Sequence, residues 1–242
     1  STGYTKWNAE HRDYLFPNLY YTENVNEKKY FWHPKLSSSI ELEILKKILQ
    51  RKSGIPSFIA QTKNKIFYRT TGGLYWKVFT NFQPKFYFNG ILGSSSRETS
   101  FSVSGENNNT QIVGLLSSNT FWWWYTLTSN LRDLNPSDIN GFRFGKELID
   151  ENKILELSEE LIEDLKTNSQ MLQRIQKNKG ITVTQSFKIS KSKPIIDQID
   201  TVLAQHYGFT EEELDFIINY DIKYRMGKAL YGEEENGEED ED

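Results

Sequence analysis

Hydrophobic positions recur at helical spacing in the segment Ser39–Arg51. Ile40, Ile44, Leu45 and Ile48 fall on one face when successive residues are about 100° apart. Most other positions are polar or charged, which is typical of a helix that buries one face against a core. The pattern therefore predicts an amphipathic helix at the start of the folded region.

Later segments show the same spacing. Lys146–Lys179 is predicted to form one long amphipathic helix. Two C-terminal helices follow: the first opens at Pro194 and stops at Gly208, and the second starts at Thr210, where Glu213 completes a capping box. The apolar stripe of the long helix consists of Ile154, Leu157, Leu161, Leu165, Leu172 and Ile175.

Aromatic and β-branched residues across Ile66–Thr80 indicate paired strands instead. The dipeptide Gly72-Gly73 in their middle is typical of a two-residue hairpin turn, because the favoured turns need positive φ angles. The predicted register pairs Ile66 with Phe79, Phe67 with Val78, Tyr68 with Lys77, Arg69 with Trp76, and Thr71 with Leu74.

Further strands are expected near Lys85–Phe88, near Ser100–Ser104 and within 181–190, and Thr110–Leu127 is predicted to be one helix. Together these elements predict an α+β fold with a β-rich centre and a hairpin, flanked by a long amphipathic helix and C-terminal helices. We divide the chain into a lead-in segment with an amphipathic helix (1–55), a β-rich target recognition domain (56–145), a helical C-terminal region (146–231) and a disordered acidic tail (232–242).

The distribution of charge changes the picture at the C-terminus. The net charge of −4 conceals a basic body, because residues 232–242 hold eight acids and no base. Without this tail, 25 acids face 29 bases, which gives a net charge of +4. A mildly basic body permits nucleic-acid binding without requiring it.

Composition excludes several kinds of site. The chain has no cysteine, which rules out disulfides, thiolate zinc sites and a cysteine nucleophile. The histidines, His11, His33 and His206, are scattered, and we expect no metal site. No apolar run reaches the about 18 residues that span a membrane, and no signal-peptide pattern opens the chain. We expect a cytoplasmic protein, and the missing initiator methionine indicates a processed chain or a fragment.

The sequence contains no catalytic constellation, and we name no catalytic residue. Acidic pairs such as Glu159-Glu160 alternate with the leucine stripe and are interpreted as a solvated helix face. The Gly72-Gly73 dipeptide lacks the lysine and hydroxyl of a phosphate-binding loop. An independent enzyme is therefore the least favoured function.

Features of a binding protein are more prominent. Aromatic residues are 14% of the chain, and they interleave with bases along the expected hairpin. Arginine and asparagine contact base edges bidentately, and lysine contacts phosphates. From the residues alone, an ordinary sheet with cross-strand cation–π pairs explains the pattern equally well. The candidate DNA-binding residues are Arg69, Lys77, Arg97, Arg132, Asn135 and Arg143.

Four blocks of sequence together resemble the C-terminal region of adenine-specific DNA methyltransferases. The chain is most similar to the Eco57I-like, type IIG restriction–modification group, whose C-terminal half is a TaqI-like target recognition domain. The resemblance covers most of residues 35–230. The blocks are YRTTGGLYWKVFTNFQP at 68–84, SSSRETS at 94–100, LLSSNTFWWWYTLTSNLRDLNPSDI at 115–139 and KSKPIIDQIDTVLAQHYGFTEEELDFIINYDIKYRMG at 191–227.

The resemblance implies that function is divided between two parts of a longer protein. In that group an N-terminal catalytic domain binds S-adenosylmethionine and methylates adenine N6, whereas the C-terminal domain grips double-stranded DNA and selects the sequence. The string nearest to the group's methyltransferase signature, NPSD at 135–138, lacks the second proline and the aromatic ring that stacks a flipped base. We therefore expect a recognition fragment that is inactive alone, holds no cofactor, and partners DNA and the parent's catalytic domain.

The three tryptophans Trp122–Trp124 stand directly before the polar segment 129–139. Because successive helical residues are about 100° apart, they cannot all face one core. Either the helix is buried around most of its circumference, or one face meets a partner. Our hypothesis is that these tryptophans, with Trp76 in a supporting role, hold Arg132 and Asn135 where they can meet DNA.

Two other functions stay open. The long amphipathic helix and the acidic tail could make the chain an assembly module of a restriction–modification complex. Stacked aromatic residues could instead bind single-stranded nucleic acid. The block at 191–227 is rich in acids, and we expect it to dock against the catalytic domain or the long helix rather than against DNA.

Overall fold

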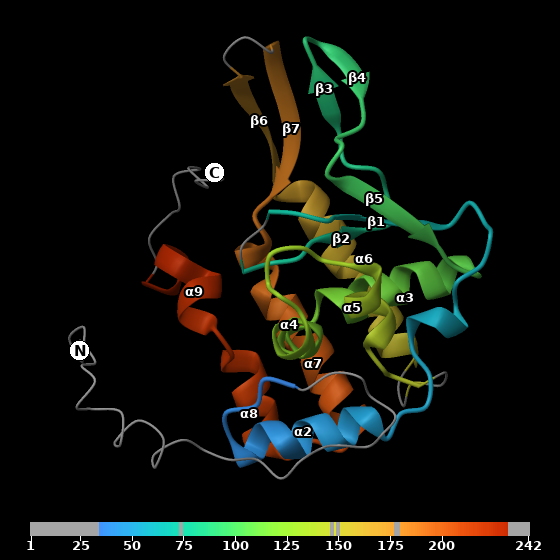
Figure 1. Cartoon of the computed structure of the whole chain (residues 1–242), viewed down its shortest axis with the longest axis vertical. Coiled ribbons are helices and arrows are strands. Elements are labelled where there is room, and N and C mark those ends of the chain that lie inside the picture. Colours follow the sequence, from blue (N-terminus) through green and yellow to red (C-terminus); the bar gives the residue numbers. More distant parts are fainter. Residues whose placement is uncertain (1–33, 73–74, 146–147, 149–150, 177–179, 232–242) are drawn as a thin grey trace, which may run out of the picture.

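The computed structural model describes residues 34–72, 75–145, 148, 151–176 and 180–231 (Figure 1). The chain has the predicted α+β fold, with two antiparallel sheets and a group of helices. One sheet lies on the helices, and the other projects away from this body (Figure 1). The expected acidic tail and most of the lead-in segment lie outside the described residues.

The helices are α2 (Ser39–Leu49), α3 (Glu106–Ser117), α4 (Asn119–Thr128), α5 (Pro136–Gly141), α6 (Glu151–Thr167), α7 (Lys193–Tyr207), α8 (Glu211–Asn219) and α9 (Ile222–Met226). Short 3-10 turns are η2 (Ile55–Ser57), η3 (Ile189–Ser192) and η4 (Gly227–Tyr231). The strands are β1 (Lys65–Arg69), β2 (Phe79–Thr80), β3 (Phe86–Phe88), β4 (Ile91–Gly93), β5 (Glu98–Ser102), β6 (Ser169–Gln176) and β7 (Gly180–Phe187).

The three-stranded sheet has the order β2-β1-β5. Its register corrects the predicted hairpin: Tyr68 lies opposite Phe79, two positions beyond the predicted partner Lys77. A shift of two keeps each side chain on its face, so both aromatic rings are buried, with their centroids 5.7 Å apart. Residues 70–72 and 75–78 are consequently outside the paired strands, so the predicted two-residue turn is wrong; positions 73–74 lie outside the described residues.

The projecting sheet has the order β4-β3-β7-β6. Strands β3 and β7 confirm the strands predicted near Lys85–Phe88 and within 181–190. The predicted single long helix is wrong, because α6 ends at Thr167 and both Leu172 and Ile175 belong to β6. Strand β7 pairs with β3 as well as β6, so the sheet joins the β-rich centre to the region expected to be helical.

The helix predicted over Thr110–Leu127 is broken into α3 and α4 at Ser118. Ser118 has an extended backbone (ψ 156°), and its hydroxyl accepts the N–H of Phe121 at 3.0 Å. This is the geometry of an N-cap residue, which starts a new helix. The capping box predicted at Thr210 is confirmed at the start of α8, where the Glu213 carboxylate accepts the N–H of Thr210 at 2.6 Å.

One continuous hydrophobic core connects the helices with the three-stranded sheet. The predicted stripe of α6 is buried from Ile154 to Leu165, where the helix contacts α3 and α7. The 191–227 block therefore does contact the helix that replaces the expected long one. In the described part of the chain, no helix combines the length and apolar character needed to cross a membrane.

Candidate nucleic-acid interface

Helix α4 is buried around its whole circumference. The exposed fractions of Trp122, Trp123 and Trp124 are 5%, 0% and 2%. Each indole N–H has a partner on a different element, so the three side chains point in different directions, as their helical spacing requires. In order, they donate to the Asp221 carboxylate before α9 at 3.4 Å, the Glu41 carboxylate on α2 at 3.4 Å and the Asp138 carbonyl on α5 at 3.1 Å.

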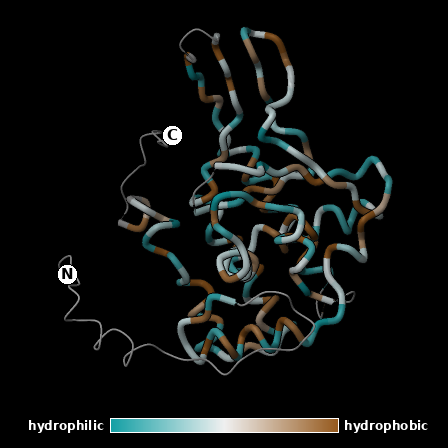
Figure 2. Tube along the Cα trace, viewed as in Figure 1, coloured by the Kyte–Doolittle hydropathy of each residue, from teal (hydrophilic) through white to brown (hydrophobic). Residues whose placement is uncertain are grey.

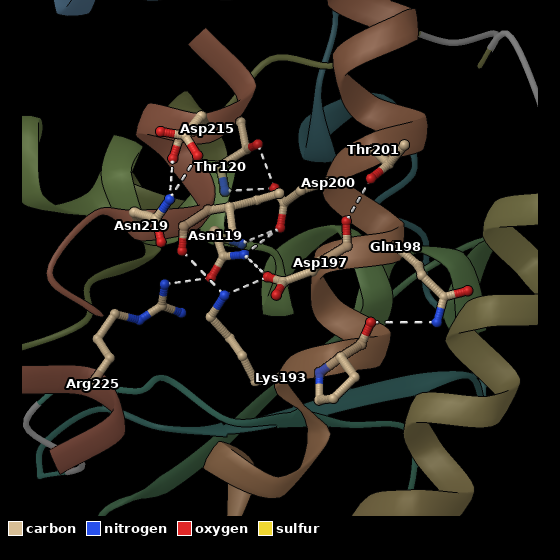
Figure 3. A network of polar contacts seen from close by, with 12 residues as sticks. Asn119, Thr120, Lys193, Asp197, Gln198, Asp200, Thr201, Asp215, Asn219 and Arg225 are labelled. Atoms are coloured by element: carbon tan, nitrogen blue, oxygen red, sulfur yellow. Dashed lines mark hydrogen bonds and ion pairs between the residues drawn. The ribbon is translucent and has the colours of Figure 1, made fainter. Parts of the chain in front are cut away.

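A buried carboxylate from α7 fixes the start of α4 (Figure 3). Asp200 is fully buried, and its two oxygens accept the N–H groups of Asn119 and Thr120 at 2.8 and 2.9 Å. The Thr120 hydroxyl donates to the same carboxylate at 2.6 Å. These amides are among those that a helix leaves without an internal partner at its N-terminus, where the helix dipole also favours a negative charge.

The same network reaches Trp76, which precedes β2, through Arg225 of α9. Asn119 donates to Asp197 at 2.8 Å and accepts from the guanidinium of Arg225. That guanidinium lies 3.8 Å from the centroid of the Trp76 ring, and the Arg225 carbonyl accepts the Trp76 indole N–H at 2.6 Å. Burial lowers the pKa of Arg225 to about 10, so it remains a cation at neutral pH. Trp76 is thus connected to the start of α4.

The charge of Asp200 should make stability depend on pH. Burial raises its pKa from 3.8 to about 6, against the opposing effect of its hydrogen bonds. Between these values the folded chain keeps a proton on Asp200 that the unfolded chain has lost. The contribution of Asp200 to the free energy of unfolding is therefore complete below pH 3.8 and is lost as the pH rises through about 6. We expect the wild type to lose about 2–3 kcal/mol of unfolding free energy over this window, relative to Asp200→Asn.

Urea denaturation of both proteins at several pH values between about 4 and 7 measures this difference. The variant is the matched control because it keeps a side chain of similar size that does not titrate. If the free energies of unfolding of the two proteins changed with pH in parallel, the prediction of a raised pKa for Asp200 would be contradicted.

Three loops meet just beyond the end of β1, the central strand of the three-stranded sheet. Thr70 links them, because its N–H donates to the carbonyl of Arg97 at 2.9 Å and its carbonyl accepts the N–H of Leu134 at 2.8 Å. A β-bridge between Thr71 and Asp133 adds a further backbone contact between the first and third of these loops. We call these residues, 69–72, 95–98 and 130–135, the loop cluster.

The turn that follows α4 is held by its own side chains. The Asn130 amide oxygen accepts the N–H groups of Arg132 and Asp133 at 3.0 and 3.2 Å. The hydroxyl of Tyr125, on α4, donates to the Asp133 carbonyl at 3.3 Å. Leu131 adopts φ 64°, a conformation that costs a residue with a Cβ about 1–2 kcal/mol. The turn therefore has a defined shape and is anchored to the buried helix.

The structure brings together four of the six predicted binding residues. Arg97, Arg132 and Asn135 are exposed in the loop cluster. Arg69 is half-buried at the end of β1, opposite Glu98. Asn135 also begins α5, and its N–H donates to the Asp138 carboxylate at 2.8 Å.

The two remaining candidates are occupied by contacts within the fold. Lys77 is 7% exposed, donates to the Gly72 carbonyl at 3.0 Å and lies 5.4 Å from the centroid of the Tyr125 ring. Arg143 contacts the carbonyl of Leu49, at the end of α2, at 3.5 Å. The structure thus gives both cations internal contacts, and neither is part of the binding surface proposed below.

Sequence reasoning missed the residues that support this surface. Asp200 belongs to the acid-rich block at 191–227 that we expect to face away from DNA, and it points inward and caps α4. Arg225 carried no signal that separated it from the other bases of its block. The only available signal was the Ser-Asn-Thr run at 118–120, which is typical of a helix start.

The exposed side chains of the loop cluster can donate hydrogen bonds to phosphates and base edges. Among the described residues, no group of three or more histidine, aspartate or glutamate side chains could hold a metal ion. A scan against protein-family models found no match to this sequence, and a search of curated proteins found no significant one.

Proposed function

We propose that the chain is a sequence-specific recognition domain for double-stranded DNA. In this proposal it serves a restriction–modification adenine-N6 DNA methyltransferase, whose separate N-terminal domain binds S-adenosylmethionine and performs the chemistry. The chain itself transfers no methyl group. Methyl transfer by this chain alone would overturn the proposal.

One observation carries the proposal. Arg97 and Arg132 come from segments far apart in the sequence, yet backbone hydrogen bonds through Thr70 place both in one loop cluster with exposed side chains. Arginine is the side chain that most often contacts guanine edges in the major groove, and it also binds phosphates. A shared, rigid support keeps two such side chains in a constant relative position, which sequence-specific binding requires.

The rigid support consists of the buried parts of the molecule. Helix α4 is buried on all sides, its start is capped by Asp200, and its end is joined to the turn by Tyr125. A side chain that is fixed before binding loses less conformational freedom when it meets DNA.

The alternative functions have narrower support. The apolar stripe of α6 is already covered by α3 and α7, which leaves it unavailable as a surface for assembly. A single-stranded nucleic acid could stack on Tyr75 and Tyr224, which are exposed and whose rings stack at 5.3 Å. These two residues are a small platform, because the tryptophans of α4 are buried.

Replacing Arg132 by alanine tests the proposal. We expect affinity for a preferred duplex to fall about 10- to 100-fold and preference among duplexes to weaken, because a bidentate base contact contributes about 1–3 kcal/mol. Fluorescence anisotropy with the preferred duplex and with a scrambled duplex measures both quantities. Lys52→Ala removes an exposed cation beyond the end of α2 and should leave both nearly unchanged. Unchanged affinity and preference in Arg132→Ala would contradict the assignment of the loop cluster.

A further inference from the structure

The projecting sheet has features that the loop cluster does not explain. Its β3–β4 and β6–β7 hairpins extend beyond the helical body, and hydrophobic segments run along them (Figures 1 and 2). Ile91 is 74% exposed, Leu92 is 66% exposed and Ile175 is 77% exposed. Large apolar side chains that are exposed together at the end of a projection indicate a surface that meets a partner.

The far end of this sheet has a defined shape. Asn89 and Gly90 form the turn of the β3–β4 hairpin with φ angles of 48° and 80°, the positive values of a tight hairpin turn. Asn89 also joins the two hairpins: its N–H donates to the carbonyl of Ile181, and its amide oxygen accepts the N–H of Ile181, each at 2.8 Å. The exposed apolar residues therefore stand on one joined unit.

Cross-strand pairing places one mixed row of side chains on a single face. Phe88 lies opposite Ile91 on β4 and opposite Thr182 on β7, and Thr182 lies opposite Arg174 on β6. Residues directly opposite each other share a face of the sheet. The row therefore contains two apolar side chains, a hydroxyl and an arginine, of which all but the hydroxyl side chain are exposed.

Charge identifies the kind of partner. In the sequence, the segments 85–93 and 169–188, within which the four strands lie, contain five bases and no acid. A polyanion fits such a surface, whereas a patch that joins two copies of this basic sheet would place like charges together.

Strand β4 is also separated from Arg97 by only residues 94–96, which can span at most about 14 Å. The sheet is thus directly connected to the loop cluster.

We propose that the far end of the projecting sheet enters the major groove of the same duplex that the loop cluster binds. This inference rests on the proposed function. A single sheet with its side chains is about 10 Å thick, and the major groove is about 12 Å wide and admits β-strands. Ile91 and Phe88 then contact the apolar edges of bases, for which the thymine methyl is the natural target, and Arg174 contacts phosphate or a base edge.

Chemical protection tests the inference. Because the chain has no cysteine, Ile91→Cys introduces a single thiol at an exposed position. Its rate of alkylation by a maleimide is measured with and without a randomised duplex, and anisotropy of the same samples measures how much duplex is bound. When about nine-tenths of the protein is bound, we expect alkylation to slow about tenfold. Glu43→Cys, on α2 at the opposite end of the molecule, is the control and should be unaffected (Figure 1).

The possible outcomes separate the two proposals. Bound duplex with an unprotected thiol overturns the inference and leaves the proposed function standing. No bound duplex overturns both. Protection that appears without DNA and increases with protein concentration identifies the sheet as an interface between copies of the chain and overturns the inference. The salt dependence of duplex binding by Arg174→Ala is a second measurement. The slope of log affinity against log salt concentration should become shallower by about one. An unchanged slope counts against a phosphate contact by Arg174.

Discussion

Trp123→Ala is expected to lower the free energy of unfolding by about 3–5 kcal/mol. Trp123 is fully buried in α4, so its removal leaves a cavity among the helices that surround it. The loss also leaves the buried Glu41 carboxylate without the indole N–H that it accepts at 3.4 Å. Urea denaturation followed by circular dichroism measures the change.

Trp123→Phe is the matched control for this prediction. It keeps an aromatic ring but removes the indole N–H, so we expect an intermediate loss of about 1–3 kcal/mol. A loss below about 1 kcal/mol in the alanine variant would mean that α4 is not the buried centre of the fold.

Asp200→Ala is expected to destabilise the chain by about 3–5 kcal/mol at neutral pH. The change removes the acceptor for two backbone N–H groups and the Thr120 hydroxyl at the start of α4. It also removes a negative charge that stabilises the buried guanidinium of Arg225. Leaving buried donors without acceptors, and a buried cation with less negative charge near it, is more costly than the loss of an average hydrogen bond.

Asp197→Ala provides the comparison. The side chain of Asp197 is 30% exposed and contacts Lys193 and Asn119, so its loss should cost about 1 kcal/mol or less. Thermal denaturation of the two variants under identical conditions measures both effects. If the two substitutions were equally mild, the cap on α4 would contribute little to the fold.

Local signals in the sequence were sufficient for several elements. The capping box at Thr210 and the stop at Gly208 depend on residues within one helical turn, and the structure has both. The end of α6 could not be predicted in this way. Leu165, Leu172 and Ile175 keep helical spacing, and only pairing with β7 makes the last two part of a strand. That pairing is a tertiary effect that periodicity does not record.

The hairpin register and the candidate site show the same limit. Gly72-Gly73 is a local signal for a hairpin turn, but the backbone of Thr70 is paired with Arg97 and Leu134 instead. Arg97 and Arg132, both named from the sequence as binding candidates, are exposed. The burial of Lys77 could not be predicted, because it depends on packing against Tyr125, far away in the sequence.

Selection from a randomised duplex pool at two salt concentrations, followed by sequencing of the bound fraction, tests the central claim most directly. The proposal predicts that one short motif is enriched and that affinity falls as salt rises, because arginines on the loop cluster replace counterions on the phosphates. Arg132→Ala analysed in parallel should lose the enrichment. Absence of both enrichment and salt-dependent binding in the wild type would contradict a role in recognising double-stranded DNA.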